Sequence, residues 1–251
     1  MPHFILQTDQ DGLLQEFPNA VRNSCSFQNW YHHDHRYTWE LCSDPEKIPH
    51  DTLIHAIPIG TIEFCEQFLK LIGKEPLIPA LNIPLILGNY AHRGIWWDCN
   101  ERDVGILLQD HKRLFIKEQG RCKGFSDIVN LKSTIPGGKR YLVSRIIPDI
   151  KAEWRIFFDR GKIVDAKPYI LDEWFLPDRE EIEDMLFTWK EQPPAGTIDV
   201  AIDKKCCQYL LECHPFVSVG LYGLDEAEIA PMAQRAWKWV LAEEENNSPK
   251  T

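Results

Sequence analysis

Two acidic side chains, Asp199 and Glu212, interrupt apolar runs near the end of the chain. Burying a carboxylate without a partner is costly, so each of them needs a cation. If the two segments form a hairpin with a two-residue turn at Lys205-Cys206, Asp199 lies directly opposite Glu212, with Cβ atoms roughly 5 Å apart. His214 then shares the face of Glu212, because side chains alternate along a strand.

This arrangement suits a divalent cation. Two carboxylates on rigid strands, with phosphate oxygens completing the coordination shell, are typical ligands of Mg²⁺. Asp199, Glu212 and His214 are therefore the candidate metal ligands. The spacing leaves one alternative open, in which both acids form ion pairs with lysines inside the sheet.

Basic residues precede the acidic pair and are candidates for binding phosphate. Lysine acts as a point charge on phosphate oxygens, whereas arginine offers a planar pair of donors. Lys167 lies opposite Arg155 only if the turn at Arg160-Gly161 contains a bulge. Taken singly, each lysine has the alternative of being a solvated surface residue. The candidates are Lys117, Lys123, Arg155 and Lys167.

Strands with hairpin signals are predicted from about residue 110 onward to position these groups. Gly161 can supply the positive φ that a short turn between two strands needs. An acidic segment opened by Pro177-Asp178 has helical spacing as far as Trp189, and a final helix is predicted at about 225–243. The predicted strands are 113–117, 140–147, 153–158, 162–169, 198–202 and 208–213.

The first hundred residues favour a small α/β domain. Residues 53–59 form an apolar run that is followed by Gly60-Thr61 and then by apolar residues at helical spacing, which predicts a strand, a turn and a helix with Thr61 as N-cap. A second apolar run at 83–87 fits the same alternation of strand and helix. We predict an N-terminal α/β domain at 1–105 and a catalytic domain at 106–251, in an overall α+β fold.

The order of the motifs along the chain is informative in its own right. It is Lys117, Lys123-Gly124-Phe125, Leu142 to Ile147, Glu153-Trp154-Arg155, Asp199, Glu212-Cys213-His214 and Phe216 to Gly223. This order resembles the C-terminal two thirds of the ATP-grasp superfamily, and more narrowly a compact, amidoligase-associated branch found in bacteria and their phages. The resemblance covers about residues 50–240 and implies an ATP-grasp fold with antiparallel sheets and flanking helices.

The resemblance implies roles for the candidate residues. Lys117 would contact the α-phosphate of ATP, and Lys123 would belong to the loop that closes over the phosphates. Arg155 and Lys167 would stabilise the transferring phosphoryl group, and Asp199 and Glu212, with His214 as a further candidate, would bind Mg²⁺. The remaining cofactor-binding candidates are Ser144, Arg145, Ile146 and Ile147, which would line the adenine pocket, and Glu153.

Two positions depart from the pattern of this family. It commonly has asparagine two residues after the metal-binding glutamate, where this chain has His214, and imidazole suits Mg²⁺ less well than an oxygen ligand. An altered metal preference and a weakened activity both remain open for this reason. Ser144-Arg145 stands where many relatives carry an acidic residue, which leaves the ribose contact unassigned.

The implied activity is an ATP- and Mg²⁺-dependent carboxylate–amine ligase that works through an acylphosphate, with an amino acid, a peptide or a small metabolite as substrate. The alternatives are a catalytically silent module that binds nucleotide or protein, and an ATP-dependent kinase. His214 is the feature that favours a silent module.

Bulk properties exclude several other classes. The 251 residues are 44% hydrophobic, which is typical of a globular protein, and 28 basic against 38 acidic residues give a net charge of −10. A nucleic-acid partner is not expected at this charge. Neither a signal sequence nor an apolar run of roughly 20 residues is present, so we expect a cytoplasmic protein without a membrane partner.

Other chemistry-bearing residues have simpler interpretations. The eight cysteines are scattered without a CxxC spacing, which predicts reduced thiols. His32, His33 and His35 surround Asp34, but consecutive histidines on a strand diverge, so a metal site there is disfavoured.

Overall fold

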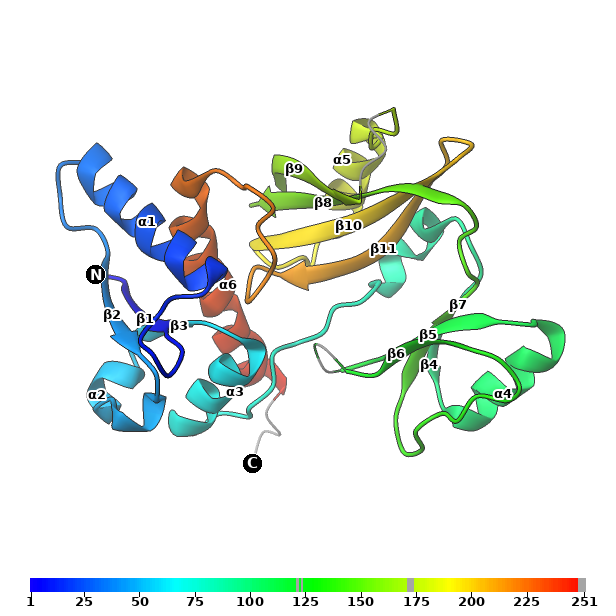
Figure 1. The fold of residues 1–251 in the computed structure, drawn as a ribbon, viewed down its shortest axis with the longest axis horizontal. Helices are drawn as coiled ribbons and strands as arrows, with labels where there is room; N and C mark the ends of the chain where they lie inside the picture. Colours follow the sequence, from blue (N-terminus) through cyan, green and yellow to red (C-terminus); the bar gives the residue numbers. More distant parts are fainter. Residues whose placement is uncertain (121, 123, 171–173, 248–251) are drawn as a thin grey trace. The chain divides into compact units, whose positions relative to one another are not determined.

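The computed structural model describes residues 1–120, 122, 124–170 and 174–247. Figure 1 shows the order of the helices and strands. The chain forms two compact units, of which the first comprises residues 1–78, 193–196 and 215–251 and the second residues 79–192 and 197–214. Each unit is thus built from separate stretches of sequence. The predicted assignment of 1–105 and 106–251 as domains stays a prediction.

The first unit contains a three-stranded parallel sheet in the order β2 (Thr38–Cys42), β1 (His3–Gln7) and β3 (Ala56–Ile59). The central strand is fully buried from Phe4 to Leu6, as expected for a parallel sheet that is covered on both faces. Strands and helices alternate here, as predicted for the N-terminal α/β part.

The helices of the first unit follow from local sequence signals. Thr61 caps α3 (Ile62–Leu71) as predicted, because its hydroxyl accepts a hydrogen bond from the Phe64 N–H at 3.2 Å. Asp44 caps a short 3-10 helix in the same way. The remaining helical elements of this unit are α1 (Glu16–Tyr31), η1 (Pro45–Lys47), α2 (His50–Leu53) and α6 (Glu226–Asn247).

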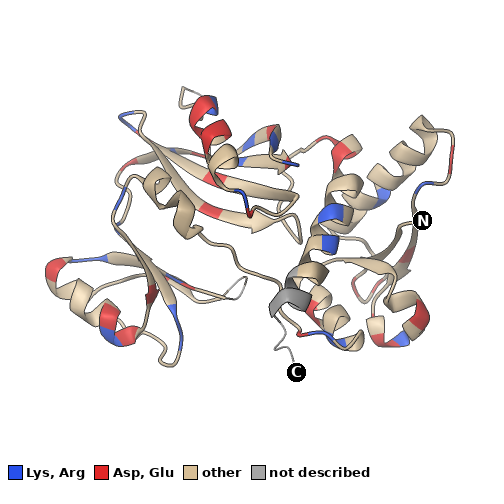
Figure 2. Cartoon of the chain, turned by 180° about the vertical axis from the view of Figure 1, so that it is seen from behind, with Lys and Arg blue, Asp and Glu red and all other residues tan. Residues whose placement is uncertain are grey.

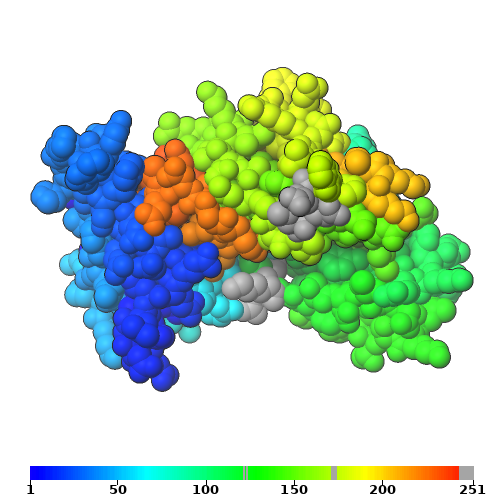
Figure 3. Space-filling model, turned by 45° about the horizontal axis from the view of Figure 1, so that its top comes forward, coloured from blue at the N-terminus to red at the C-terminus, as the bar shows by residue number. Residues whose placement is uncertain are grey.

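Helix α1 supports α6 at a proline. Pro231 lies inside α6 and has no N–H to donate to the carbonyl of Ala227, four residues earlier. Gln28 of α1 donates to that carbonyl at 2.6 Å, and Ser24 of α1 accepts from the N–H of Ala230 at 2.9 Å. In Figure 3 the blue segment that includes α1 also borders the orange segment after β11, in agreement with a ring contact of 5.7 Å between Phe17 and Phe216.

The second unit contains two four-stranded sheets. One has the order β4 (Ile95–Cys99), β7 (Tyr141–Ser144), β5 (Leu114–Glu118) and β6 (Ser126–Val129), and its printed strand pairs are antiparallel. Helix α4 (Glu101–Asp110) opens with a capping box between Asn100 and Asp103. Val104 and Leu108 of this helix belong to a buried cluster with residues of the strands.

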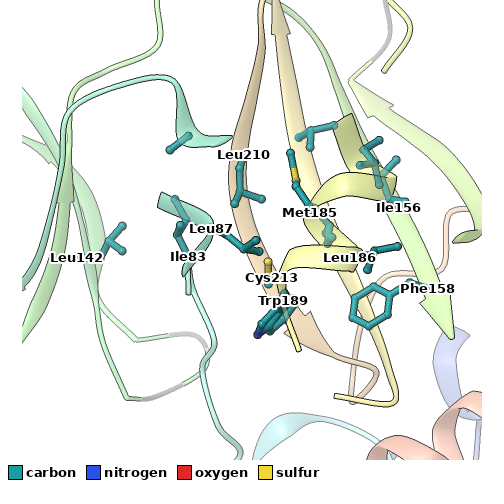
Figure 4. Packing of buried hydrophobic residues seen from close by; sticks show 14 residues of the cluster. Ile83, Leu87, Leu142, Ile156, Phe158, Met185, Leu186, Trp189, Leu210 and Cys213 are labelled. Carbon is teal, nitrogen blue, oxygen red and sulfur yellow. The ribbon is translucent and has the colours of Figure 1, made fainter. Parts of the chain in front are cut away.

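The other sheet has the order β11 (Gln208–Pro215), β10 (Ala195–Asp203), β8 (Ile150–Asp159) and β9 (Lys162–Ile170). Helix α5 (Arg179–Thr188) is capped by Asp178 and carries the acidic residues that stand out in Figure 2. Its apolar side chains pack against the sheet in the cluster drawn in Figure 4, where Met185, Leu186 and Trp189 lie near Leu210 and Cys213.

Two local predictions are wrong. The apolar run at 83–87 forms no strand, because Pro84 precedes a 3-10 helix, η2 (Leu85–Ala91), in which Leu87 is buried while Leu85 is exposed. The connection between β10 and β11 is four residues long, 204–207, and not a two-residue turn. The Asp203 carboxylate shapes it by accepting hydrogen bonds from the N–H groups of Lys205 and Cys207 at 2.8 and 3.0 Å.

Candidate active site

The two acids and the histidine converge on one face of the sheet formed by β11, β10, β8 and β9. Asp199 lies between Ile198 and Val200, which belong to the buried cluster on the other face, so period two directs Asp199 away from it. One ligand atom from each of Asp199, Glu212 and His214 lies within 4.8 Å of the other two. Within the described part of the chain this is the single group of three acidic, histidine or cysteine side chains with such spacing. Their role as metal ligands stays a prediction.

Arg155 of β8 holds Asp199 of the neighbouring strand β10. Its Nε donates to Oδ1 at 2.8 Å and its Nη2 donates to Oδ2 at 2.6 Å, which is a bidentate pair. Asp199 is 2% exposed and Arg155 is 9% exposed, so solvent screens this pair weakly. The strand order places the predicted phosphate-binding arginine beside the predicted metal-binding aspartate.

Lys117 of β5 forms an ion pair with Glu212 of β11. Burial lowers the pKa of Lys117, while the negative charge of Asp199 opposes that shift. Glu212 also contacts His214, with Nε2 and Oε1 2.9 Å apart. The ion pairs that the sequence left open as an alternative are therefore present, with Arg155 and Lys117 as the cations.

A β-bulge brings Lys167 opposite Arg155. Asp159 pairs with Lys162 and Phe158 with Ile163, but Phe157 pairs with Asp165, so β9 has one additional residue. This shift produces the Arg155–Lys167 register that the sequence made conditional on a bulge. Lys167 is only partly exposed, and its Nζ lies 2.9 Å from the Asp165 carboxylate.

The sequence analysis missed Tyr169. The Arg155 guanidinium carbon lies 6.0 Å from the centre of the Tyr169 ring, and the phenol forms a hydrogen bond with Glu153. Burial, followed by the nearby Asp199 charge, raises the pKa of Tyr169 well above its usual range. Period-two counting from Lys167 along β9 was the signal available in the sequence, because it places Tyr169 on the same face.

The predicted adenine segment lies at the end of β7. Ser144 is the buried last residue of the strand, whereas Arg145 and Ile146 are exposed and Ile147 is half-buried. The Arg145 N–H donates to the Gly94 carbonyl at 3.0 Å. The backbone between β7 and β8 thus starts from a buried strand and continues into solvent.

The predicted phosphate loop follows β5, and Lys123 lies outside the described residues. Its two ends are held together, because the Glu118 N–H donates to the Phe125 carbonyl at 2.7 Å and the Glu118 carboxylate accepts from the Phe125 N–H at 3.0 Å. Lys139 donates to the same carboxylate at 2.5 Å. Glu118 therefore anchors the base of this loop.

His214 is a neutral imidazole at pH 7. Burial lowers its pKa to about 4, and the positive charge of Lys117 adds to this effect while Asp199 opposes it. Between pH 4 and its usual pKa of about 6.5, the unfolded chain binds more protons at this position than the folded chain does. Stability from this group is therefore complete above about pH 6.5 and falls as the pH drops towards 4.

We expect the free energy of unfolding to lose about 2 kcal/mol from this one group between pH 7 and pH 5. Urea unfolding of the wild type and of His214→Asn at both pH values measures it, because the variant lacks the titrating ring. The wild type should lose about 2 kcal/mol more than the variant. Equal losses in the two proteins would contradict the burial of a neutral His214.

Other motifs form no second centre. Residues 32–35 are exposed, and their histidines belong to no metal-compatible group among the residues that the structure covers. No disulfide joins any of the eight cysteines, all of which lie in described positions, as predicted. Of the helices that can be described, none is long and apolar enough to cross a lipid bilayer.

The model of an ATP-grasp domain family, the second family of its clade, matches residues 90–232, more than half of the chain. The chain belongs to the ATP-grasp superfamily. This membership confirms the predicted superfamily and the predicted α+β ATP-grasp fold, while the amidoligase-associated branch of bacteria and phages stays a prediction. No curated protein matches the sequence.

Solved structures of ATP-grasp enzymes share this fold. D-cycloserine synthetase DcsG has a TM-score of 0.54 and 12% identity, over 95% of this chain and 99% of that one. D-alanine–D-alanine ligase from Bacillus anthracis has a TM-score of 0.51 and 11% identity, over 99% and 100%. ATP-grasp ligase PsnB, complexed with its minimal precursor, Mg and ADP, has a TM-score of 0.50 and 7% identity, over 95% and 97%. At these identities the likeness extends to the fold alone.

Proposed function

We propose that the chain is an ATP- and Mg²⁺-dependent ligase that joins a carboxylate to an amine through an acylphosphate. The observation that carries this proposal is the meeting of Arg155, Lys117, Asp199, Glu212 and His214 at one place in a chain of the ATP-grasp superfamily. The solved neighbours named above are a synthetase and two ligases, and one of them contains Mg and ADP, which supports the same assignment.

The donor set fits a divalent cation. Asp199 and Glu212 offer carboxylate oxygens and His214 offers a neutral ring nitrogen, all within 4.8 Å of one another. Bound there, Mg²⁺ would neutralise charge on the β- and γ-phosphates of ATP. Removal of the ion pairs described above would free the carboxylates for this role.

The cationic residues would hold the phosphates. Lys117 would bind the α-phosphate, and Arg155, with Lys167 opposite it in the register, would stabilise the phosphoryl group during transfer. Lys123 would close over the phosphates, and Ser144 to Ile147 would line the adenine pocket, with Glu153 as a further cofactor-binding residue. Tyr169 would keep the Arg155 guanidinium in place.

The reaction has two steps. A carboxylate oxygen of the first substrate attacks the γ-phosphorus of ATP, the bond to the bridging oxygen breaks, and ADP leaves. The amine nitrogen of the second substrate then attacks the acyl carbon, phosphate departs with the electrons of the carbon–oxygen bond, and the nitrogen loses a proton. The side chains form no covalent intermediate in this scheme; they position the substrates and stabilise phosphoryl charge.

Product analysis tests the proposal. ATP and Mg²⁺ are incubated with amino acids, peptides and small carboxylates, each with and without an amine, and ADP, phosphate and organic products are quantified by mass spectrometry. We expect ADP, phosphate and an amide in equal amounts. A stable phosphoester without free phosphate would indicate a kinase instead. Bound ATP without ADP release from any mixture would indicate a silent nucleotide-binding module.

A further inference from the structure

The site differs from an all-oxygen magnesium site in one ligand, His214. Its Nε2 lies 2.9 Å from Glu212 Oε1. Neighbouring ligand atoms around a six-coordinate ion with bonds of about 2.1 Å are separated by about 3.0 Å, so the pair is spaced like two adjacent ligands of one small divalent ion. Asp199 completes the group within 4.8 Å.

The neighbouring cysteine supplies no ligand to this group. Cys213 lies between Glu212 and His214 in sequence but belongs to the buried apolar cluster on the opposite side of the sheet (Figure 4). The ligand set is therefore two carboxylates and one imidazole, without a thiolate. Thiolates select the softest ions, so their absence disfavours a site for Cu(I) or an iron–sulfur cluster.

We propose that His214 is a specificity-determining residue that makes this site prefer a transition-series divalent cation, such as Co²⁺ or Mn²⁺, over Mg²⁺. The carboxylates serve both kinds of ion, whereas imidazole nitrogen binds transition-series ions better than it binds Mg²⁺. The difference in affinity between the two kinds of ion must then come from His214. This inference rests on the proposed function and concerns the cation that its site takes.

The test compares wild type with His214→Asn, which replaces the ring nitrogen by an amide oxygen of similar reach. Calorimetric titrations of each protein with Co²⁺ alone and with Mg²⁺ alone give the two dissociation constants. We expect the variant to bind Co²⁺ at least about tenfold more weakly, with a much smaller change for Mg²⁺. An unchanged ratio of the two constants, or no binding of Co²⁺ to the wild type, would overturn the inference.

Pulsed electron paramagnetic resonance of bound Mn²⁺ gives a direct signature. The wild type should show coupling of the manganese to a ring nitrogen, and His214→Asn should lose it while Glu212→Gln loses the bound ion. Bound Mn²⁺ without nitrogen coupling in the wild type would overturn the preference. Amide formation by the wild type with ATP and Mg²⁺ tests the ligase assignment separately, because it does not depend on which cation binds more tightly.

Discussion

Asp199→Ala is expected to abolish turnover and to lower the free energy of unfolding by about 3–5 kcal/mol. The loss of turnover follows from the proposed metal site, which keeps only Glu212 and His214. The loss of stability follows from the bidentate pair, because Arg155 stays buried without the carboxylate that accepts two of its hydrogen bonds. Urea unfolding and an ADP-release assay measure the two effects.

A double variant separates the two effects. Replacing a buried ion pair by apolar side chains of similar volume is often neutral or stabilising, so Asp199→Leu combined with Arg155→Met should recover most of the lost stability and none of the turnover. An Asp199→Ala protein as stable as the wild type would show that the pair is not buried as described. Full turnover in that variant would remove Asp199 from the mechanism.

Glu212→Gln is expected to lower turnover about 10²–10³-fold while changing the free energy of unfolding by only about 1 kcal/mol. The variant keeps the shape of the side chain and removes its charge. Glu212 is 26% exposed and Lys117 is 17% exposed, so water can solvate the lysine when its partner is lost, unlike the arginine beside Asp199.

Metal titration distinguishes weakened coordination from damage to the site. If Glu212 binds the cation, raising the concentration of the divalent ion beyond saturation of the wild type should restore part of the turnover of Glu212→Gln. Lys204→Gln is a matched control, because Lys204 pairs with Asp149 at the surface and should leave turnover unchanged. Turnover of Glu212→Gln equal to that of the wild type would contradict the assignment.

The strands and their order of motifs were predictable from the sequence because period-two patterns and hairpin signals are local. The run at 83–87 was mispredicted because a strand and a buried 3-10 segment have the same composition, and only Leu87 of the central residues is needed in the core. The long turn at 204–207 depends on the Asp203 side chain, which no periodicity reveals.

The candidate site was predictable residue by residue but not in its pairing. Alternation indicated that Glu212 and His214 share a face. Long-range partners could not be derived, because the Lys117–Glu212 pair joins strands of two different sheets and the Arg155–Asp199 pair depends on β8 lying beside β10. Tyr169 was missed because a tyrosine in a strand is ordinarily a packing residue.

The pairing of Asp199 with Arg155 and of Glu212 with Lys117 makes the resting cluster electroneutral, with His214 uncharged. A lone cation entering it would strand two positive side chains, and a lone triphosphate would strand two negative ones. A nucleotide that arrives together with its counter-ion offers every displaced group a replacement of the right sign. We therefore expect each of the two to strengthen the binding of the other, with the protein's own ion pairs as the competitor that both must displace.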